Sequence, residues 1–292
     1  MQNKRVLLIV NTKSRSGLAS LPAVHQAFLD AGFSVIVPPQ NDERSSSDLI
    51  REKSAEADLI VIGGGDGSIH SAGPGLLAAG KPFGIIPLGT ANDLARTLRL
   101  PTDLDGAIGV ITKGHTARID VGEVNGHPFF NVASLGLSAE LALKLTARKK
   151  KIFGPFSYAI AALRVLARAR PFRAEIIAHG RHAHVRSYQI AVGNGRYYGG
   201  GMAVHEAAAI DDHQLHLYSL EMTALWKLLF IAPDFRAGRH GAWEEVRIED
   251  GRHFEVRTRH PHAVNADGEI VTTTPAIFTL RPAALEVFVP VL

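Results

Sequence analysis

The first 120 residues alternate short apolar runs with segments in which apolar residues recur at helical spacing. The runs are RVLLIVN, FSVIV, DLIVIGG and PFGIIPLG, and the segments between or after them are LPAVHQAFLDAG, SDLIREKSAEA, SIHSAGPGLLAAG and TANDLARTL. Runs that are apolar at nearly every position are typical of parallel strands covered by helices on both faces. Ser20, Leu21 and Pro22 indicate the start of the first helix, and Gly32 its end. The pattern predicts an α/β unit with a parallel sheet.

After about residue 120 the pattern changes to strands. They are RAEIIAHG, HAHVRSYQIAVGNG, QLHLYSLE, EEVRIEDG, HFEVRTRH and AIFTLRP, interrupted by an apolar, basic stretch at 141–170 and by TALWKLLFIA. This half is predicted to be a mainly antiparallel β-sandwich. We place the domains at residues 1–121 and 122–282, expect residues 283–292 to return to the first, and expect a ligand in a cleft that they share.

Composition and targeting signals narrow the possible chemistry. The chain has 292 residues and no cysteine, which excludes disulfides, thiolate metal sites and a cysteine nucleophile. The apolar run in MQNKRVLLIVN is too short for a signal peptide, and no stretch has the length of a transmembrane helix. We therefore expect a cytoplasmic protein that does not span a membrane.

The charge of the chain points to anionic partners. A net charge of +4 suits nucleic acid, anionic lipid or phosphorylated small molecules. Much of it lies in ARKKK at 147–151, beside Ile152, Phe153 and Phe156. A basic flank on an apolar segment suits peripheral contact with a membrane surface, and a solvated helix face is the alternative.

Three turns follow strands of the predicted parallel sheet. They are VNTKSRSG, GGGDGS and PLGTANDLAR. All three open on the carboxyl edge of the sheet, where sheets of this kind bind ligands. We expect the strand at 59–62 to end before its glycines, which tolerate positive φ and let backbone amides approach a phosphate. A tight turn without a ligand is the alternative, because neither the Rossmann nor the Walker pattern is present.

A fourth stretch, VNADGEIV, has Asp267 and Glu269 on either side of a glycine, as in a hairpin turn. Together with IDVGEVNG and VGNGRYYGGGM, the turns GGGDGS, PLGTANDLAR and NADGE occur in the order and spacing of one family. The chain resembles the diacylglycerol-kinase-like lipid kinases, which include diacylglycerol, sphingosine and ceramide kinases and their bacterial relatives. The resemblance runs nearly end to end, with PLGTANDLAR its most specific part. It implies a first domain like those of NAD kinase and phosphofructokinase.

The resemblance implies ATP and Mg²⁺ as cofactors and assigns residues to them. The residues expected around the nucleotide phosphates are Asn11, Thr12, Lys13, Ser14, Arg15, Gly64, Gly65, Asp66, Gly67, Ser68, Thr90 and Asn92. Asp66 is expected to orient the phosphates or the catalytic Mg²⁺, with support from Asp120. Glu269 is expected to be the general base that takes the proton from the lipid hydroxyl as it attacks the γ-phosphate.

The implied reaction is therefore an ATP-dependent phosphorylation of a lipid hydroxyl, with diacylglycerol as the expected acceptor and phosphatidic acid as the product. A membrane surface is the expected partner, nucleic acid is not, and a homodimer stays open. The alternatives are an NAD kinase-like enzyme and a catalytically silent nucleotide- or lipid-binding module. PLGTANDLAR and VGNGRYYGGGM argue against the NAD kinase-like enzyme. The silent module gains weight from two departures from the family pattern: His70 and Ser71 replace Asn-Glu, and Pro38, Pro39 and Gln40 leave the adenine and ribose contacts open. Ser68 replaces Thr but keeps the hydroxyl.

A second cation site is expected in the turn AIDDHQLHL. The resemblance implies that the Asp212 carboxylate and the backbone carbonyls of Ala209 and Gln214 hold a structural Mg²⁺ or Ca²⁺, since hard cations prefer oxygen ligands. His213 stands where the family has glycine, so a bare turn is the alternative. Histidine pairs such as His182 and His184 are typical of a solvated strand face, and we do not expect a zinc site. No G-x-S-x-G motif indicates a serine hydrolase.

Overall fold

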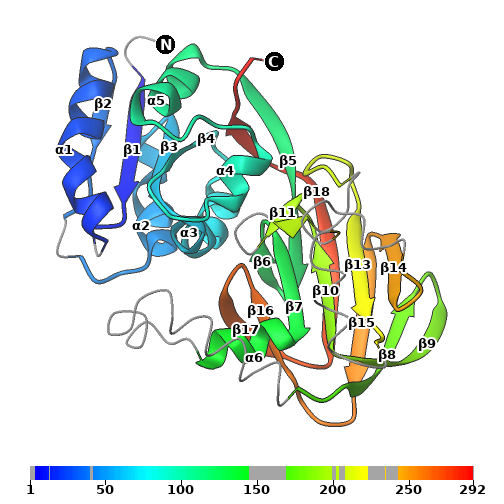
Figure 1. The fold of residues 1–292 in the computed structure, drawn as a ribbon. Helices are drawn as coiled ribbons and strands as arrows, with labels where there is room; N and C mark the ends of the chain where they lie inside the picture. The colour runs from blue at the N-terminus through cyan, green and yellow to red at the C-terminus, as the bar shows by residue number, and fades with distance from the viewer. Residues whose placement is uncertain are drawn as a thin grey trace. The chain divides into compact units, whose positions relative to one another are not determined.

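The computed structural model describes residues 4–12, 14–39, 42–144, 169–198, 202–203, 208–222, 234 and 243–291. The chain divides into two compact units (Figure 1), one made of Met1–Val121 with Pro282–Leu292 and the other of Gly122–Arg281. Both boundaries fall inside strands, β5 (Thr116–Val124) and β18 (Ala276–Phe288). The basic run at 147–151, its apolar neighbours and TALWKLLFIA lie outside the described residues.

The sheet of the first unit is parallel, as the hydrophobic pattern predicts. Its strands lie in the order β2 (Ser34–Ile36), β1 (Arg5–Val10), β3 (Leu59–Gly64) and β4 (Phe83–Pro87). The last part of β18 pairs with β4 in parallel, through Val287 and Phe83. Every residue of β3 and β4 is buried, which explains their uninterrupted apolar runs. The expected end of the strand before the glycines is wrong, because β3 continues through Gly63 and Gly64.

Helices cover this sheet. They are α1 (Arg15–Asp30), α2 (Ser46–Lys53), the 3₁₀ turn η1 (Ser54–Glu56), α3 (Asp66–Ala79), α4 (Asp93–Thr97) and α5 (Leu104–Lys113). Helix α1 packs against α5, and α2 packs against α3. The second contact is close, because a Cβ on Gly75 would lie 2.6 Å from the Ser47 carbonyl oxygen. A Cβ on Gly84 of β4 would likewise lie 2.5 Å from the Ile111 side chain of α5.

The first helix starts earlier than its sequence suggests. It begins at Arg15 and not near Ser20, because the Ser14 hydroxyl accepts a hydrogen bond from the Gly17 N–H at 3.0 Å and caps the first turn. Pro22 lies inside the helix. Its fixed φ is compatible with helical backbone, so it marks no boundary here.

The second unit is an antiparallel sandwich, which confirms the predicted fold class. One sheet has the order β14 (Val246–Gly251), β13 (Leu215–Leu220), β10 (Gln189–Gly193), β7 (Val132–Gly136), β16 (Ala263–Ala266) and β17 (Glu269–Thr273). The facing strands are the first part of β18, β15 (His253–Thr258), β8 (Phe172–Ala178) and β9 (Arg181–Ser187). Smaller elements are β6 (His127–Phe129), α6 (Leu137–Lys144), β11 (Tyr197–Tyr198) and β12 (Met202–Ala203). Leu135 and Leu217 of the first sheet share a core with Ile176, Phe254 and Phe278 of the second.

None of the helices in the described part of the chain is both long and apolar enough to cross a membrane.

Candidate functional site

The turns after β1 and β3 are tied together by Asn11. Its side-chain Nδ2 donates a hydrogen bond to the Ser68 hydroxyl at 3.2 Å, and its backbone N–H donates to the Gly63 carbonyl at 2.9 Å. Its own carbonyl accepts from the Ser14 hydroxyl at 2.9 Å. The two turns that the sequence assigns to phosphate binding therefore meet at the carboxyl edge of the sheet.

The turns after β3 and β4 touch through glycine backbones. A Cβ on Gly89 would lie 2.5 Å from the Gly65 Cα atom, and a Cβ on Gly65 would lie 3.0 Å from the Gly89 Cα atom. A Cβ on Gly64 would overlap the Ser68 side chain. None of the glycines at 63–67 has a positive φ, so the expectation of a positive φ there is wrong; the approach of their backbone amides to a phosphate stays a prediction. The close approach of two backbones requires Gly65 and Gly89, and the neighbouring Ser68 side chain requires Gly64.

Asp66 and Asn92 hold the third turn in place. Asp66 is the first residue of α3, and its Oδ1 accepts a hydrogen bond from the Leu94 N–H at 3.2 Å. Asn92 has a left-handed backbone with a φ of 50°. Its side-chain amide binds both backbone polar groups of Gly89: Oδ1 accepts from the Gly89 N–H at 3.0 Å, and Nδ2 donates to the Gly89 carbonyl at 2.9 Å. Thr90 is exposed between them.

Two helices begin at this edge. Helix α1 starts directly after Ser14, and α3 starts directly after Gly65. Helix N-termini carry a partial positive charge and favour anions such as phosphate. Around Gly67, in the first turn of α3, a Cβ would meet no atom within 4 Å, so the turn is open there. Lys13 and the Arg15 side chain lie outside the described residues.

A cavity of about 430 Å³ opens beside these turns, within the range of small-molecule sites. One part of its lining comes from the turns themselves: Asn11, Thr12, Gly67 and Ser68. Another part comes from the segment after β2: Val37, Pro38, Pro39, Asp42, Glu43, Arg44, Ser45 and Ser46. The prolines that depart from the family pattern thus lie in the wall of this cavity.

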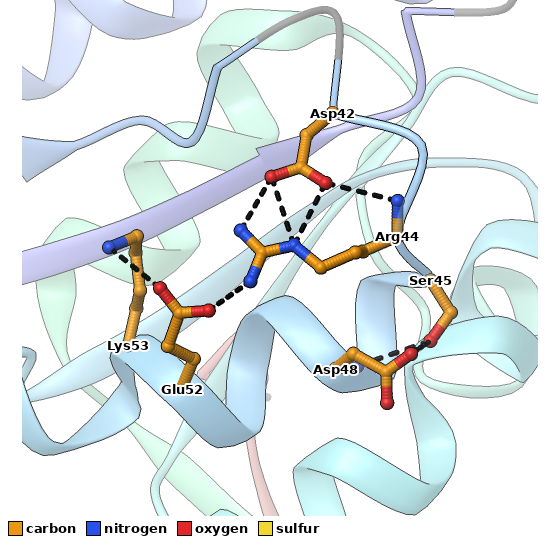
Figure 2. Close-up of polar contacts among 6 residues, drawn as sticks. All are labelled: Asp42, Arg44, Ser45, Asp48, Glu52 and Lys53. Carbon is orange, nitrogen blue, oxygen red and sulfur yellow. Dashed lines mark hydrogen bonds and ion pairs between the residues drawn. The ribbon is translucent and has the colours of Figure 1, made fainter.

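Arg44 fastens that wall to helix α2 (Figure 2). Its Nε donates to Asp42 Oδ1 at 2.9 Å and its Nη2 donates to Asp42 Oδ2 at 2.6 Å. Its Nη1 pairs with Glu52 of α2, whose carboxylate also lies 3.3 Å from Lys53 Nζ. The hydrogen bonds from Arg44 lower the pKa of Asp42 to about 2. Ser45 caps α2 by accepting from the Asp48 N–H at 3.1 Å.

Asp120 is buried on β5, near the end of the first segment of the first unit. Its Oδ1 accepts a hydrogen bond from the Ala283 N–H at 2.6 Å, and Arg118 Nη1 donates to the Ala283 carbonyl at 3.1 Å. Ala283 has a positive φ of 46°, which these bonds stabilise. Asp120 therefore anchors the returning C-terminal segment, and its support of Asp66 stays a prediction.

In the second unit Asp267 and Glu269 differ sharply in their contacts. Asp267 and Gly268 form the predicted hairpin turn, with φ values of 49° and 101°. The Asp267 carboxylate accepts from three backbone N–H groups, of Phe130 at 2.7 Å, Asn131 at 2.9 Å and Val132 at 3.2 Å. Glu269, the first residue of β17, is exposed, and its carboxylate has no hydrogen bond or ion pair among the described residues.

In the turn expected to hold a second cation, the Asp212 carboxylate is already hydrogen-bonded to other residues. The Asp212 carboxylate accepts from the Ala209 N–H at 3.0 Å and the Gln214 N–H at 2.9 Å, and its Oδ2 lies 2.9 Å from His216 Nε2. His216 Nδ1 lies 2.7 Å from Asp250. Burial lowers the pKa of His216, but the two carboxylates outweigh burial and raise it. A cation at this turn stays a prediction; within the described ranges no group of three His, Asp or Glu side chains could hold a metal.

Each of the two units matches a known protein family. Residues 5–124 match the diacylglycerol kinase catalytic domain, and residues 131–289 match the YegS C-terminal NAD kinase beta sandwich-like domain. The chain belongs to the diacylglycerol-kinase-like lipid kinases. Membership of this kinase family implies ATP as the phosphate donor.

Relatives of this lipid kinase family cover nearly the whole chain. A diacylglycerol kinase of Staphylococcus saprophyticus is 28% identical over 98% of this chain and 96% of its own length. One of Staphylococcus carnosus is 27% identical over 98% of this chain and 95% of its own length. A crystal structure of a proposed diacylglycerol kinase from Bacillus anthracis strain Sterne superposes with a TM-score of 0.83, at 25% identity, covering 99% of this chain and 96% of that one.

The residues of the first unit fit the nucleotide that the lipid kinase family implies. Close-packed glycine backbones and two helix N-termini lie at this edge of the sheet, and the cavity lies beside them. Sequence reasoning missed Asp42 and Arg44 of this lining. Their signal was a charged triplet, Asp42-Glu43-Arg44, directly before the serine cap of a helix.

Proposed function

We propose that this lipid kinase transfers the γ-phosphate of ATP to the hydroxyl of diacylglycerol and forms phosphatidic acid. The main support is the meeting of the three glycine-rich turns beside a cavity of about 430 Å³ in the first unit. Backbone amides at the starts of α1 and α3 bind the phosphates, and the adenosine occupies the cavity. Asp66 orients the phosphates or a Mg²⁺ that neutralises them.

The acceptor hydroxyl needs a base, and the contacts of the two hairpin carboxylates favour Glu269. Three backbone N–H groups occupy the Asp267 oxygens, whereas Glu269 is exposed and, among the described residues, has no partner. In the proposed step Glu269 takes the hydroxyl proton, the lipid oxygen bonds to the γ-phosphorus, and the bond from that phosphorus to the bridging oxygen of ADP breaks.

The test is transfer from labelled ATP to a panel of acceptors offered side by side, with each product identified by mass spectrometry. The panel contains diacylglycerol, sphingosine, ceramide and NAD. We expect labelled phosphatidic acid as the main product and its loss in Glu269→Gln. Labelled NADP would support the NAD kinase-like alternative. Binding of ATP without transfer to any acceptor would support a silent binding module, and either result would overturn the proposal.

A further inference from the structure

Strands β8, β9 and β15 present one face to the sandwich core and the other to solvent. Ala174, Ile176, Val185 and Val256 point to the core, as their burial shows. Because side chains alternate along a strand, the residues between them point outward. Four arginines lie on or beside that outer side and all four are exposed: Arg173, Arg186, Arg257 and Arg259. We call this surface the arginine face.

Two of these arginines lie directly opposite each other. Arg173 of β8 and Arg186 of β9 are register partners in the antiparallel pair, so their side chains leave the sheet on the same side. Like charges in this arrangement are destabilising unless an anion lies nearby. Among the described residues neither side chain has an ion pair.

The nearby carboxylates already form hydrogen bonds with other side chains. Glu255 accepts from Arg257 Nε at 2.6 Å and from its Nη2 at 3.1 Å. Glu175 lies 2.9 Å from His182 Nδ1, and that contact lowers the Glu175 pKa. In the described part of the chain these two glutamates therefore leave Arg173 and Arg186 uncompensated.

An open hollow of about 620 Å³ lies on this face. The four arginines and His184 line it, with Glu175 as the one carboxylate of the described lining. One row further along the sheet, Glu255 lies between Ile177 and Ile277 in register, and Ile277 is 43% exposed. The face thus combines an excess of positive charge with one exposed apolar side chain, Ile277, and one half-buried, Ile177.

We propose that the arginine face docks this protein on an anionic lipid bilayer. The charge complements lipid phosphates, and the isoleucines suit the boundary between headgroups and acyl chains. Among the described residues that line the hollow, none is aromatic and able to stack on bases, which disfavours single-stranded nucleic acid. The inference rests on the proposed function in one respect, because a lipid acceptor requires contact with a membrane.

Vesicle sedimentation tests the docking surface without any turnover. The protein is mixed with vesicles of phosphatidylcholine alone or of phosphatidylcholine with phosphatidylglycerol, at low and high salt. We expect binding to the anionic vesicles that weakens with salt. Arg173→Gln with Arg186→Gln should lower the partition coefficient roughly fivefold for each arginine removed.

The matched control removes two exposed arginines outside the hollow, Arg181→Gln with Arg252→Gln, and changes the net charge equally. Thermal unfolding of both double variants checks that they fold. Binding close to wild type in the control supports the inference. Equal loss in both variants, or no loss in the first, overturns it, as does binding to DNA without binding to vesicles. A protein that binds these vesicles but phosphorylates no lipid would refute the proposed function alone.

Discussion

At the scale of single residues, two carboxylates in one hairpin differ in their contacts. Asp267 and Glu269 are separated by Gly268, and the sequence predicts the turn correctly because Asp-Gly is a strong hairpin signal. The sequence does not show that Asp267 binds three amides of the segment 130–132, because that contact joins residues far apart in the chain. The division of roles follows from this long-range contact.

Replacing Glu269 should remove the base and little else. We expect Glu269→Gln to lower kcat by about 10²- to 10⁴-fold, the usual contribution of a positioned general base. The KM for ATP should stay close to wild type, because Glu269 does not belong to the nucleotide lining. Glu244→Gln, at another exposed carboxylate, is the control. Steady-state kinetics measures kcat and KM for both variants. Near wild-type turnover in Glu269→Gln would contradict its role as the base and make Asp267 the next candidate.

Replacing Asp267 should instead weaken the fold. Asp267→Ala leaves three backbone N–H groups without their acceptor, and we expect the free energy of unfolding to fall by about 2–4 kcal/mol. Asp267→Asn retains one acceptor oxygen and should cost less. Denaturant titration measures both. Wild-type stability of Asp267→Asn together with a large loss of kcat would contradict the structural role and make Asp267 the base.

At the scale of elements, the positions of the turns after β3 and β4 depend on the close contact between their backbones. A Cβ on Gly89 would lie 2.5 Å from the Gly65 backbone, so Gly89→Ala must push the turns after β3 and β4 apart. We expect a rise of roughly tenfold or more in the KM for ATP, because misplaced binding groups lose their alignment. Gly109→Ala in α5, where a Cβ meets nothing within 4 Å, is the control and should be neutral or slightly stabilising.

Arg44 is a positioning residue for the cavity wall. Arg44→Gln releases Asp42 from its bidentate partner and detaches the segment 42–46 from Glu52 of α2. We expect a severalfold higher KM for ATP with kcat close to wild type, since in the proposed function this wall would contact the nucleotide equally in the ground state and the transition state. Arg51→Gln on the same helix is the control. A fall in kcat at unchanged KM would contradict this role.

Helix boundaries show where the sequence pattern was sufficient and where it was not. The helix α5 went unnoticed, although Asp103 and Gly114 are ordinary capping residues at its ends. The sequence pattern predicts the start of α1 too late, because proline is common in the first turn of a helix and Pro22 therefore suggests a start near Ser20. The observed cap is Ser14. In both cases the signal was local and present. The path of β3 through Gly63 and Gly64 was different, since only the neighbouring strands show why it continues.

At the scale of the whole molecule, the fold class was predictable from the hydrophobic pattern of the strands. A strand buried on both faces is apolar at nearly every position, whereas a strand buried on one face alternates apolar and polar residues. The uninterrupted runs of β3 and β4 are buried throughout, and the alternating β9 and β15 face solvent on one side. The cavity wall at 37–46 was not predictable in this way. It is held by the ion pairs of Arg44 with Asp42 in the same segment and with Glu52 of α2, and such pairs leave no periodic trace.

The C-terminal segment should matter to the first unit. Val287 is fully buried and pairs with Phe83 of β4, so we expect Val287→Ala to lower the free energy of unfolding by about 2 kcal/mol. Val291→Ala, at a residue that is 64% exposed, should have little effect. Denaturant unfolding with ATP as a stabilising ligand measures the change in the first unit. Equal stability of the two variants would contradict a structural role for the returning strand.

This returning strand has a consequence for synthesis on the ribosome. Residues 1–121 emerge first, yet the partner of β4 lies near residue 287, after the whole of the second unit. Until it arrives, β4 is an unpaired sheet edge, which is a template for wrong association with other chains. The sheet of the first unit is therefore completed only after the whole second unit has been synthesised. Overproduction should favour aggregation at this stage, and a chaperone that shields strand edges should raise the yield.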